Sequence, residues 1–253
     1  LLGKVPSPKI LLKAFEEVKP NLILTVPLIL EKIYKKMILP QLSKTTMKVA
    51  LNIPLLDSRI YAQIRKKLVD AFGGRFREVI VGGAAMNEEV TNFLYKIKFP
   101  FTIGYGMTEC GPLISYDHND EYVPGSCGQI LKGIMKVRID SEDPYNKVGE
   151  IQVSGENVMK GYYKNEEATS KVFTEDGWLR TGDLGTIDAD NRIYIRGRSK
   201  TMILGASGQN IYPEEIESKL NNLPFVMESI IIEKNGKLVG LVYPDYDTVD
   251  STG

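Results

Sequence analysis

The N-terminal part of this 253-residue sequence alternates between helical and extended patterns, and this alternation limits the fold more than any other feature. Apolar residues recur at helical spacing over residues 10–18, and an apolar, extended segment follows at 21–26. Further strands are predicted at residues 78–81 and 99–103, on either side of a helix that Asn87 caps. Strands that alternate with helices indicate βαβ units, so we predict a mostly parallel sheet with helices.

Two more helices are predicted between the first two strands. One runs over residues 27–39 and begins with a proline, which suits the first turn of a helix. The other runs over residues 58–72, with Asp57 as its N-cap and Gly73 as its C-terminal stop. Residues 40–57 show no clear periodicity, and we expect an irregular segment there.

From residue 128 the sequence becomes rich in β-formers, which cluster between Gly, Asp and Asn turns. No long helix is predicted between residues 127 and 197, and this pattern is typical of a small β-barrel-like module. Beyond it, Pro213 opens a helix with an acidic first turn. Two strands then flank Asn235-Gly236, which is a strong signal for a hairpin turn.

Together these patterns predict an α/β protein with two domains. Residues 1–199 form part of a large domain, with an α/β portion at 1–127 and the β-rich module at 128–199. Residues 200–253 form the start of a small α+β domain, which is incomplete. Because the sequence starts with Leu1 rather than Met and stops without a clear terminal element, we expect a piece of a longer protein.

Composition and charge argue against several function classes. Lys+Arg and Asp+Glu both total 32, so no charge excess indicates binding to nucleic acid or to an anionic membrane. The longest apolar stretch, residues 22–30, is far shorter than the roughly 18 residues that a membrane span needs, so no transmembrane segment is predicted. Cys110 and Cys127 have no metal-ligand or CxxC spacing, and no basic-then-apolar leader is present. We therefore expect a cytoplasmic protein with reduced thiols.

Two predicted strands end in loops that suit a ligand. Residues 78–81 run into Gly82-Gly83-Ala84-Ala85, and residues 99–103 run into Gly104-Tyr105-Gly106-Met107-Thr108-Glu109. If the strands are parallel neighbours, both loops open at the carboxyl edge of the sheet, where open α/β sheets bind ligands. The small residues would let a flat ring lie close to the backbone, with Tyr105 as the opposite face.

The lone carboxylate of Glu109 indicates what this ligand carries. One carboxylate beside the Thr108 hydroxyl suits Mg²⁺, which completes its shell with substrate phosphates and water. The two loops together therefore predict a nucleotide site. Taken singly, the glycines also suit a simple turn, and Glu109 also suits a solvated carboxylate.

Two clusters farther along the chain also suit a nucleotide. Asp183 lies in Trp178-Leu179-Arg180-Thr181-Gly182-Asp183-Leu184-Gly185, where an acid in a Gly-bounded turn can accept both hydroxyls of a ribose. The alternative is a turn aspartate that bonds its own backbone. Arg198 can bond ribose or phosphate through its planar fork, or it can simply be solvated. His118, the single histidine, is interpreted as a surface residue, which leaves no candidate for His-based catalysis.

Five ordered motifs follow one another along the chain: Tyr105-Gly106-Met107-Thr108-Glu109, then Gly149-Glu150-Ile151 with Lys160-Gly161-Tyr162-Tyr163, then Asp176-Gly177-Trp178 through Gly182-Asp183-Leu184, then Gly197-Arg198-Ser199-Lys200, and Asn210-Ile211-Tyr212-Pro213-Glu214-Glu215-Ile216-Glu217. In these motifs and their order the sequence resembles the adenylate-forming superfamily of acyl-CoA synthetases, luciferases and peptide-synthetase adenylation domains. Within it, the sequence is most similar to the long-chain fatty acid–CoA ligases, in Phe15-Glu16-Glu17-Val18-Lys19-Pro20, Val26-Pro27 and Leu30-Glu31-Lys32-Ile33-Tyr34.

The resemblance implies an AMP-forming ligase that uses ATP, Mg²⁺ and coenzyme A. Fatty acid and MgATP give an acyl-adenylate and pyrophosphate, and coenzyme A then takes the acyl group. The implied nucleotide-binding residues are Gly83, Ala84 and Tyr105 at the adenine, Gly106 beside them, Thr108 at the phosphates, and Asp183 and Arg198 at the ribose. The implied catalytic residues are Thr108, Glu109 and Lys200.

Two of these positions, one loop and one further glycine carry additional implied roles. Glu109 would hold Mg²⁺, and Lys200 matches the hinge about which the small domain rotates between the two half-reactions. The loop at residues 205–210 would then cover the active site for the second step, and Gly104 would border the acyl pocket. Residues 1–199 would be the C-terminal part of the adenylation domain.

The sequence also departs from the family pattern. The family's Ser/Thr/Gly-rich phosphate loop and its late catalytic lysine both fall outside this chain. Losing one preorganised donor of transition-state charge typically costs about 10²–10³ in rate, so we expect the isolated chain to be inactive. ATP–pyrophosphate exchange by the 253-residue chain would contradict this expectation. We also expect an unpaired sheet edge that favours self-association, and peripheral membrane contact is left open.

Two alternatives to the fatty acid ligase stay open. One is another acid-adenylating domain, either of an aryl acid–CoA ligase or of a peptide synthetase. The other is a non-catalytic module that binds a nucleotide.

Overall fold

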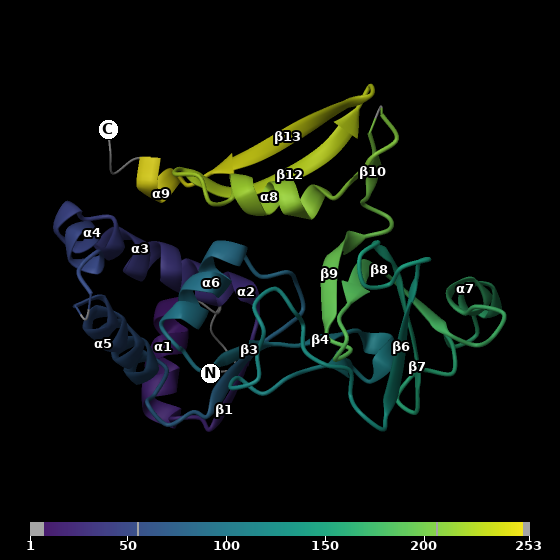
Figure 1. The fold of residues 1–253 in the computed structure, drawn as a ribbon, viewed down its shortest axis with the longest axis horizontal. Helices are drawn as coiled ribbons and strands as arrows, with labels where there is room; N and C mark the ends of the chain where they lie inside the picture. Colours follow the sequence, from purple (N-terminus) through teal and green to yellow (C-terminus); the bar gives the residue numbers. More distant parts are fainter. Residues whose placement is uncertain (1–7, 55, 206, 250–253) are drawn as a thin grey trace. The chain divides into compact units, whose positions relative to one another are not determined.

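The structure, a computed structural model, describes residues 8–54, 56–205 and 207–249. It divides into two compact units, and the chain passes between them more than once (Figure 1). The first unit comprises the chain up to Gly106 together with Tyr116–Gly128. The second comprises Met107–Ser115 and the chain from Gln129 onwards.

Three parallel strands form the sheet of the first unit, in the order β1-β2-β3. Strand β1 (Leu22–Thr25) pairs with β2 (Glu78–Val81), and β2 pairs with β3 (Phe101–Ile103). The predicted parallel sheet is confirmed, and the third strand is shorter than predicted at its start. Because all three strands run the same way, their carboxyl ends lie at one edge of the sheet.

Helix α1 (Pro8–Val18) precedes these strands, and further helical elements connect them: α2 (Pro27–Ile33), the π-helical turn η1 (Tyr34–Ile38), α3 (Leu39–Leu42), α4 (Thr45–Leu51), α5 (Leu56–Ala71) and α6 (Glu88–Lys96). The prediction of an irregular segment over residues 40–57 is wrong, because α3 and α4 occupy much of it. Neither α3 nor α4 buries any residue, so no apolar stripe marks them in the sequence.

The predicted caps of two helices have different outcomes. Asn87 caps α6 as predicted, and its Oδ1 accepts from the backbone N–H groups of Glu89 (2.9 Å) and Val90 (3.3 Å). Asp57 is not an N-cap, because α5 begins one residue earlier; its Oδ1 accepts from the next backbone N–H, that of Ser58, at 2.6 Å.

Aromatic rings from four segments meet in the core of the first unit. The Phe72 side chain is fully buried, and its ring lies 5.4 Å from that of Phe15, 6.0 Å from Phe76 and 5.7 Å from Phe99. Gly73 ends α5 as predicted, with φ of 94°, and a Cβ there would lie only 2.4 Å from the Phe15 carbonyl oxygen. The close approach of α1 to α5 therefore requires glycine at this position.

The buried Glu78 side chain anchors residues 116–128 to this sheet. Its carboxylate accepts hydrogen bonds from the Tyr116 hydroxyl and from both the backbone and side-chain nitrogens of Asn119, at 3.1 and 3.2 Å. Nδ1 of His118 lies 3.6 Å from Glu78 Oε1, but the His118 side chain is 70% exposed, so the predicted surface histidine is confirmed.

An antiparallel sheet of four strands forms the centre of the second unit, in the order β6-β7-β8-β9. Its strands are β6 (Met135–Asp140), β7 (Gly149–Gly155), β8 (Leu179–Ile187) and β9 (Ile193–Arg198). Strands β6 and β9 are its two edges, so in the described part of the chain the barrel-like module is an open sheet. The shorter elements are β4 (Tyr105–Gly106), the 3₁₀ turn η2 (Thr108–Cys110), β5 (Leu113–Ser115), α7 (Glu166–Val172), β10 (Ile203–Leu204) and β11 (Asn210–Ile211).

Asp183 lies within strand β8, not in the predicted turn. The register between β7 and β8 shifts after Glu150, which leaves a β-bulge at Thr181, Gly182 and Asp183 opposite Ile151. Gly182 has φ of 73°, a conformation that glycine adopts readily. The Thr181 hydroxyl closes the bulge, because it donates to the Ile151 carbonyl (2.7 Å) and accepts from the Asp183 N–H (3.1 Å). The glycine therefore marks a bulge, which re-aims a side chain on an otherwise regular strand.

The C-terminal part of the second unit is a helix on a hairpin. Helix α8 (Pro213–Leu220) lies along β12 (Val226–Lys234), which pairs with β13 (Lys237–Pro244) before the short α9 (Tyr246–Val249) (Figure 1). The two loop residues, Asn235 and Gly236, have φ of 55° and 71°, so the predicted hairpin turn is confirmed.

None of the helices within residues 8–54, 56–205 and 207–249 combines the length and the apolar character needed to cross a lipid bilayer.

Candidate functional site

The two predicted loops of the first unit lie at the same sheet edge. The Gly82 N–H donates to the Thr25 carbonyl (3.1 Å) and the Gly104 N–H to the Val81 carbonyl (2.9 Å), so each loop continues the ladder of the preceding strand. A Cβ on Gly82 would lie 3.4 Å from the Gly104 carbonyl oxygen, which shows how closely the loops approach. The loops are neighbours at the carboxyl edge, as predicted.

The side chains at this edge differ in exposure. Gly83, with φ of 87°, and Ala84 are exposed, and they leave a small-residue surface on the loop after β2. Tyr105 begins β4 after the β3 loop and is buried, whereas Gly106 is exposed. These four predicted residues belong to the first unit.

Thr108 and Glu109 form a 3₁₀ turn in the second unit, and three distant residues hold it. The Met159 N–H donates to the Glu109 carbonyl at 2.7 Å, and the Asn157 amide donates to the Cys110 carbonyl at 2.6 Å. The Tyr162 hydroxyl donates to Glu109 Oε1 at 2.8 Å. Both the backbone and the carboxylate of Glu109 are therefore fixed by the segment at residues 157–162.

Electrostatics distinguishes the polar groups of this turn. The hydrogen bond to the Glu109 carboxylate raises the pKa of Tyr162, so the phenol keeps its proton and acts as a donor. Burial, together with the nearby Glu109 charge, raises the pKa of Cys110 to about 11. The Cys110 thiol therefore stays protonated at neutral pH and is a poor nucleophile.

Asp183 and Arg198 form a cross-strand pair. They are register partners in β8 and β9, and Arg198 Nε donates to Asp183 Oδ1 at 2.9 Å. The Asp183 side chain is only 10% exposed, whereas that of Arg198 is 64% exposed. Two residues predicted separately are thus brought into one ion pair, whose acid is buried and whose cation reaches solvent.

Lys200 lies in the exposed turn after β9. A backbone hydrogen bond closes the turn, because the Arg198 carbonyl accepts from the Met202 N–H at 3.0 Å. A second bond ties the turn to α8, where Glu214 Oε1 accepts from Thr201 Oγ1 at 2.7 Å. The predicted hinge is therefore the link between the β6–β9 sheet and α8. The loop predicted to move with it includes residue 206, which is outside the described residues.

A family profile described as AMP-binding enzyme matches residues 2–163. This chain belongs to the AMP-binding enzyme family.

Two curated relatives illustrate the range of this family. Long-chain-fatty-acid–CoA ligase 1 of Saccharomyces cerevisiae is 28% identical over 250 residues, which cover 91% of this chain and 36% of that protein. 4-Coumarate-CoA ligase 1 of Narcissus pseudonarcissus is 33% identical over 192 residues, which cover 71% of this chain and 35% of that protein. The chain thus spans about a third of the length of these relatives, which are named for different acids.

A solved structure supports the same assignment. O-succinylbenzoate coenzyme A synthetase of Bacillus subtilis, in complex with ATP and magnesium ion, matches with a TM-score of 0.70 and 25% sequence identity, over 95% of this chain and 45% of that chain. Fold and sequence therefore agree on the AMP-binding enzyme family, and the relatives that match include acid–CoA ligases.

A metal ion in this AMP-binding enzyme would depend on few protein ligands. No group of three His, Cys, Asp or Glu side chains suited to a metal occurs in the described part of the chain. Glu109 is half-buried and offers carboxylate oxygens, the donor type that Mg²⁺ prefers. One such carboxylate fits Mg²⁺, which usually takes one or two carboxylates and fills its shell with phosphates and water.

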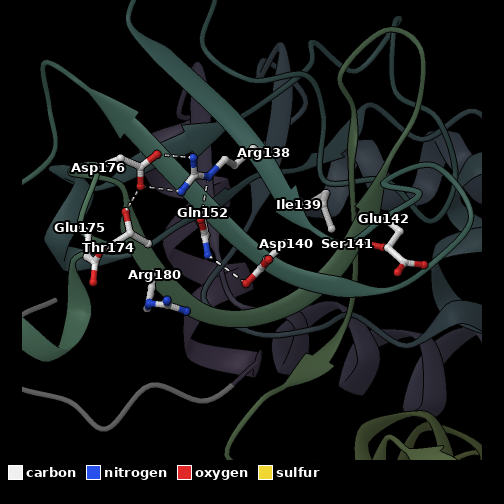
Figure 2. A pocket seen from close by; sticks show the side chains of 10 residues that line it. All are labelled: Arg138, Ile139, Asp140, Ser141, Glu142, Gln152, Thr174, Glu175, Asp176 and Arg180. Carbon is white, nitrogen blue, oxygen red and sulfur yellow. Dashed lines mark hydrogen bonds and ion pairs between the residues drawn. The ribbon is translucent and has the colours of Figure 1, made fainter.

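A separate hollow of about 800 Å³ lies on the β6–β8 sheet of the AMP-binding enzyme (Figure 2). Arg138 crosses it and donates to both Asp176 oxygens, at 2.6 and 2.9 Å, and to Gln152 Oε1 at 2.7 Å. The Arg138 guanidinium also lies 4.6 Å from the Trp178 ring centroid. None of the predicted site residues lines this hollow, and its main cation is already paired, so it carries no functional assignment.

Sequence reasoning missed two residues that shape the Glu109 turn. Tyr162 stands in one of the recognised motifs but receives no role from it. Asn157 has no local signal at all, since its amide bonds the carbonyls of Cys110 and Leu113, 47 and 44 residues away. Only the fold of the AMP-binding enzyme shows what these side chains contact.

Proposed function

We propose that this chain is part of an AMP-forming acid–CoA ligase. The enzyme joins a carboxylic acid to AMP with release of pyrophosphate, and then passes the acyl group to coenzyme A. The observation that supports this most directly is the pair of buried Asp183 and exposed Arg198, which occupy the two positions that the family resemblance assigns to the ribose. A fixed carboxylate beside a planar cation suits a diol linked to a phosphate.

The other residues receive complementary roles. Gly83 and Ala84, which are small and exposed, bind one face of the adenine, and Tyr105 and Gly106 bind from the neighbouring strand end. Thr108 has an exposed side chain that donates to the phosphates.

Glu109 is proposed to hold Mg²⁺, which when bound would neutralise charge on the phosphates of ATP. The protein's own contribution is the orientation of the Glu109 carboxylate, which Tyr162 holds from one side at 2.8 Å. The residues present therefore fit a metal that is shared between one carboxylate and the nucleotide.

The proposed acid is a long-chain fatty acid. The similarity to the yeast long-chain ligase extends over 91% of the chain, whereas that to the 4-coumarate ligase extends over 71%. The higher identity to the 4-coumarate ligase, 33% against 28%, favours a second candidate, an aryl acid such as 4-coumarate. Acyl-CoA formation from palmitate and from 4-coumarate, compared in an enzyme that contains this chain, separates the two.

We also propose the domain division at Lys200. Residues 1–199 belong to the adenylation domain, and residues 200–253 begin a small domain that turns about Lys200. The support is the exposed turn after β9, which a few hydrogen bonds to Thr201 and Arg198 close. Exposed turns with few packed side chains are suited to absorb a change of backbone torsion.

Calorimetric titration of AMP into the purified chain tests the nucleotide assignment. We expect Asp183→Asn to weaken AMP binding about tenfold to hundredfold, because it removes a charged acceptor from the ribose hydroxyls. Asp190→Asn is the matched control, since Asp190 is an exposed acid of the same module that pairs with Arg192. Thermal unfolding must first show that both variants are folded.

Two outcomes would contradict the proposal. One is wild-type chain that does not bind AMP, and the other is folded Asp183→Asn chain that binds it as tightly as wild type does. Either result favours a module of the family fold that has no nucleotide site at these residues.

A further inference from the structure

The segment at residues 157–162 contacts the Glu109 turn through both backbone and side chains. Asn157 holds the carbonyl of Cys110, Met159 holds the carbonyl of Glu109, and Tyr162 holds the carboxylate itself. A carboxylate on a short 3₁₀ turn is otherwise free to rotate about its side-chain bonds. The hydrogen bond from Tyr162 is therefore the contact that selects one orientation of the Glu109 carboxylate.

Tyr162 is itself held in place by the start of α7. Its backbone N–H donates to Thr169 Oγ1 at 2.9 Å, and the Thr169 hydroxyl donates to the Asn165 carbonyl at 2.8 Å. The Asn165 N–H in turn donates to the Tyr162 carbonyl at 3.2 Å. A Cβ on Gly161 would lie 2.8 Å from a Thr169 side-chain carbon, so this loop is closely packed. The backbone of Tyr162 is thus fixed, and its side chain extends from that position to Glu109.

The neighbouring tyrosine provides a contrast. Tyr163 is 88% exposed, and its ring lies 5.3 Å from the Lys164 ammonium. Tyr162 is 37% exposed and its hydroxyl bonds a residue 53 positions away. Of these two adjacent tyrosines, one faces solvent and the other reaches the proposed metal-binding carboxylate.

We propose that Tyr162 is a positioning residue for the metal-binding carboxylate of Glu109. Its hydroxyl donates to Oε1 and so presents the carboxylate to Mg²⁺ in a single orientation. This inference rests on the proposed function, because it assumes that Glu109 binds the metal. Hydrogen-bond donors behind a metal ligand typically change metal affinity by about tenfold to hundredfold.

Binding of Mn²⁺, used as a spectroscopic substitute for Mg²⁺, tests the inference without turnover. Electron paramagnetic resonance reports free Mn²⁺ during titration of the chain in the presence of ATP. We expect Tyr162→Phe to weaken Mn²⁺ binding about tenfold to hundredfold and Tyr163→Phe to leave it unchanged. We expect Glu109→Gln to abolish the protein-dependent binding.

A second measurement separates positioning from a general structural role. Binding of AMP without metal should be the same in Tyr162→Phe and wild type, because Tyr162 acts on the nucleotide only through Glu109 and the metal. A variant that loses metal-free AMP binding to the same degree would show that the hydroxyl merely supports the fold, and would overturn the inference.

The outcomes also distinguish this inference from the proposed function. If Glu109→Gln loses Mn²⁺ while Tyr162→Phe matches wild type or binds more tightly, only the role of Tyr162 is wrong. If Glu109→Gln binds Mn²⁺ as wild type does, or wild type binds none, the metal assignment is wrong and the inference with it. Should Tyr162→Phe fail to fold, Thr169→Val, which loosens the Tyr162 backbone, should weaken Mn²⁺ binding less but in the same direction; an unchanged affinity would contradict the inference.

Discussion

The two units hold their proposed site residues by different means. At the parallel sheet of the first unit, the loop after β2 presents backbone and small side chains, Gly83 and Ala84, placed by the carboxyl ends of neighbouring strands. In the second unit, charged side chains are held in pairs, Asp183 by Arg198 and Glu109 by Tyr162. The first arrangement follows from strand order, whereas the second depends on individual hydrogen bonds. The two should therefore respond differently to mutation.

The largest expected effect is loss of the aromatic core of the first unit. We expect Phe72→Ala to lower the free energy of unfolding of that unit by about 3–5 kcal/mol, because the fully buried ring packs on Phe15, Phe76 and Phe99. Native-state hydrogen exchange should show the loss of protection in β1–β3 and much less in β6–β9. Val49→Ala, at a side chain that is 59% exposed, is the control. Equal loss of hydrogen-exchange protection in both sheets would show that the Phe72 ring does not stabilise the first unit more than the second.

The bulge in β8 gives a smaller effect, in the second unit. Thr181→Val removes the hydroxyl that bonds the Ile151 carbonyl and the Asp183 N–H, and it leaves both groups buried without that partner. We expect a loss of about 1–3 kcal/mol in the free energy of unfolding, measured by urea denaturation. AMP affinity should fall as well, because Asp183 loses its fixed backbone. Thr186→Val, in the same strand but outside the bulge, is the control. If it lowers the free energy of unfolding and the AMP affinity as much as Thr181→Val does, Thr181 has no special role in the bulge.

The smallest effect is a pH dependence in the first unit, from Glu78. Burial opposes ionisation of this carboxyl, but the hydrogen bonds from Tyr116 and Asn119 outweigh burial and lower its pKa below the ordinary value. The ionised form then stabilises the folded state at pH above the unfolded pKa of about 4.3, and this contribution is lost as the pH falls through the lower folded pKa.

Glu78→Gln tests this pH dependence. At neutral pH the variant should be about 1 kcal/mol less stable than wild type, and the difference should shrink as the pH is lowered. Urea midpoints measured from about pH 6 to about pH 3 check both points. Glu88→Gln, at an exposed acid in the first turn of α6, should not reproduce the pattern. If the difference in stability between Glu78→Gln and wild type stays constant with pH, the packing of Glu78 and not its charge stabilises this contact.

Much of the first unit could be predicted because its signals are local. Apolar residues at helical spacing, Asn87 as a cap and Gly73 as a stop lie within a few positions of the structure that they determine. Helices α3 and α4 are exceptions, because neither buries a residue and so neither shows an apolar stripe in the sequence. In the second unit the β-rich character is predictable from the sequence, but the glycine beside Asp183 predicts a turn, whereas in the structure it marks a bulge.

The sequence by itself determined the family and the alternation of strands and helices, and it supplied the proposed nucleotide-binding residues, because motifs and periodicity depend on neighbouring positions. Only the tertiary structure decided which side chains meet. The Glu109 carboxylate contacts a phenol 53 positions away, and Glu78 bonds Asn119 across 41 positions. Such pairs depend on how separate segments fold onto each other, and no local pattern in the chain encodes that distance.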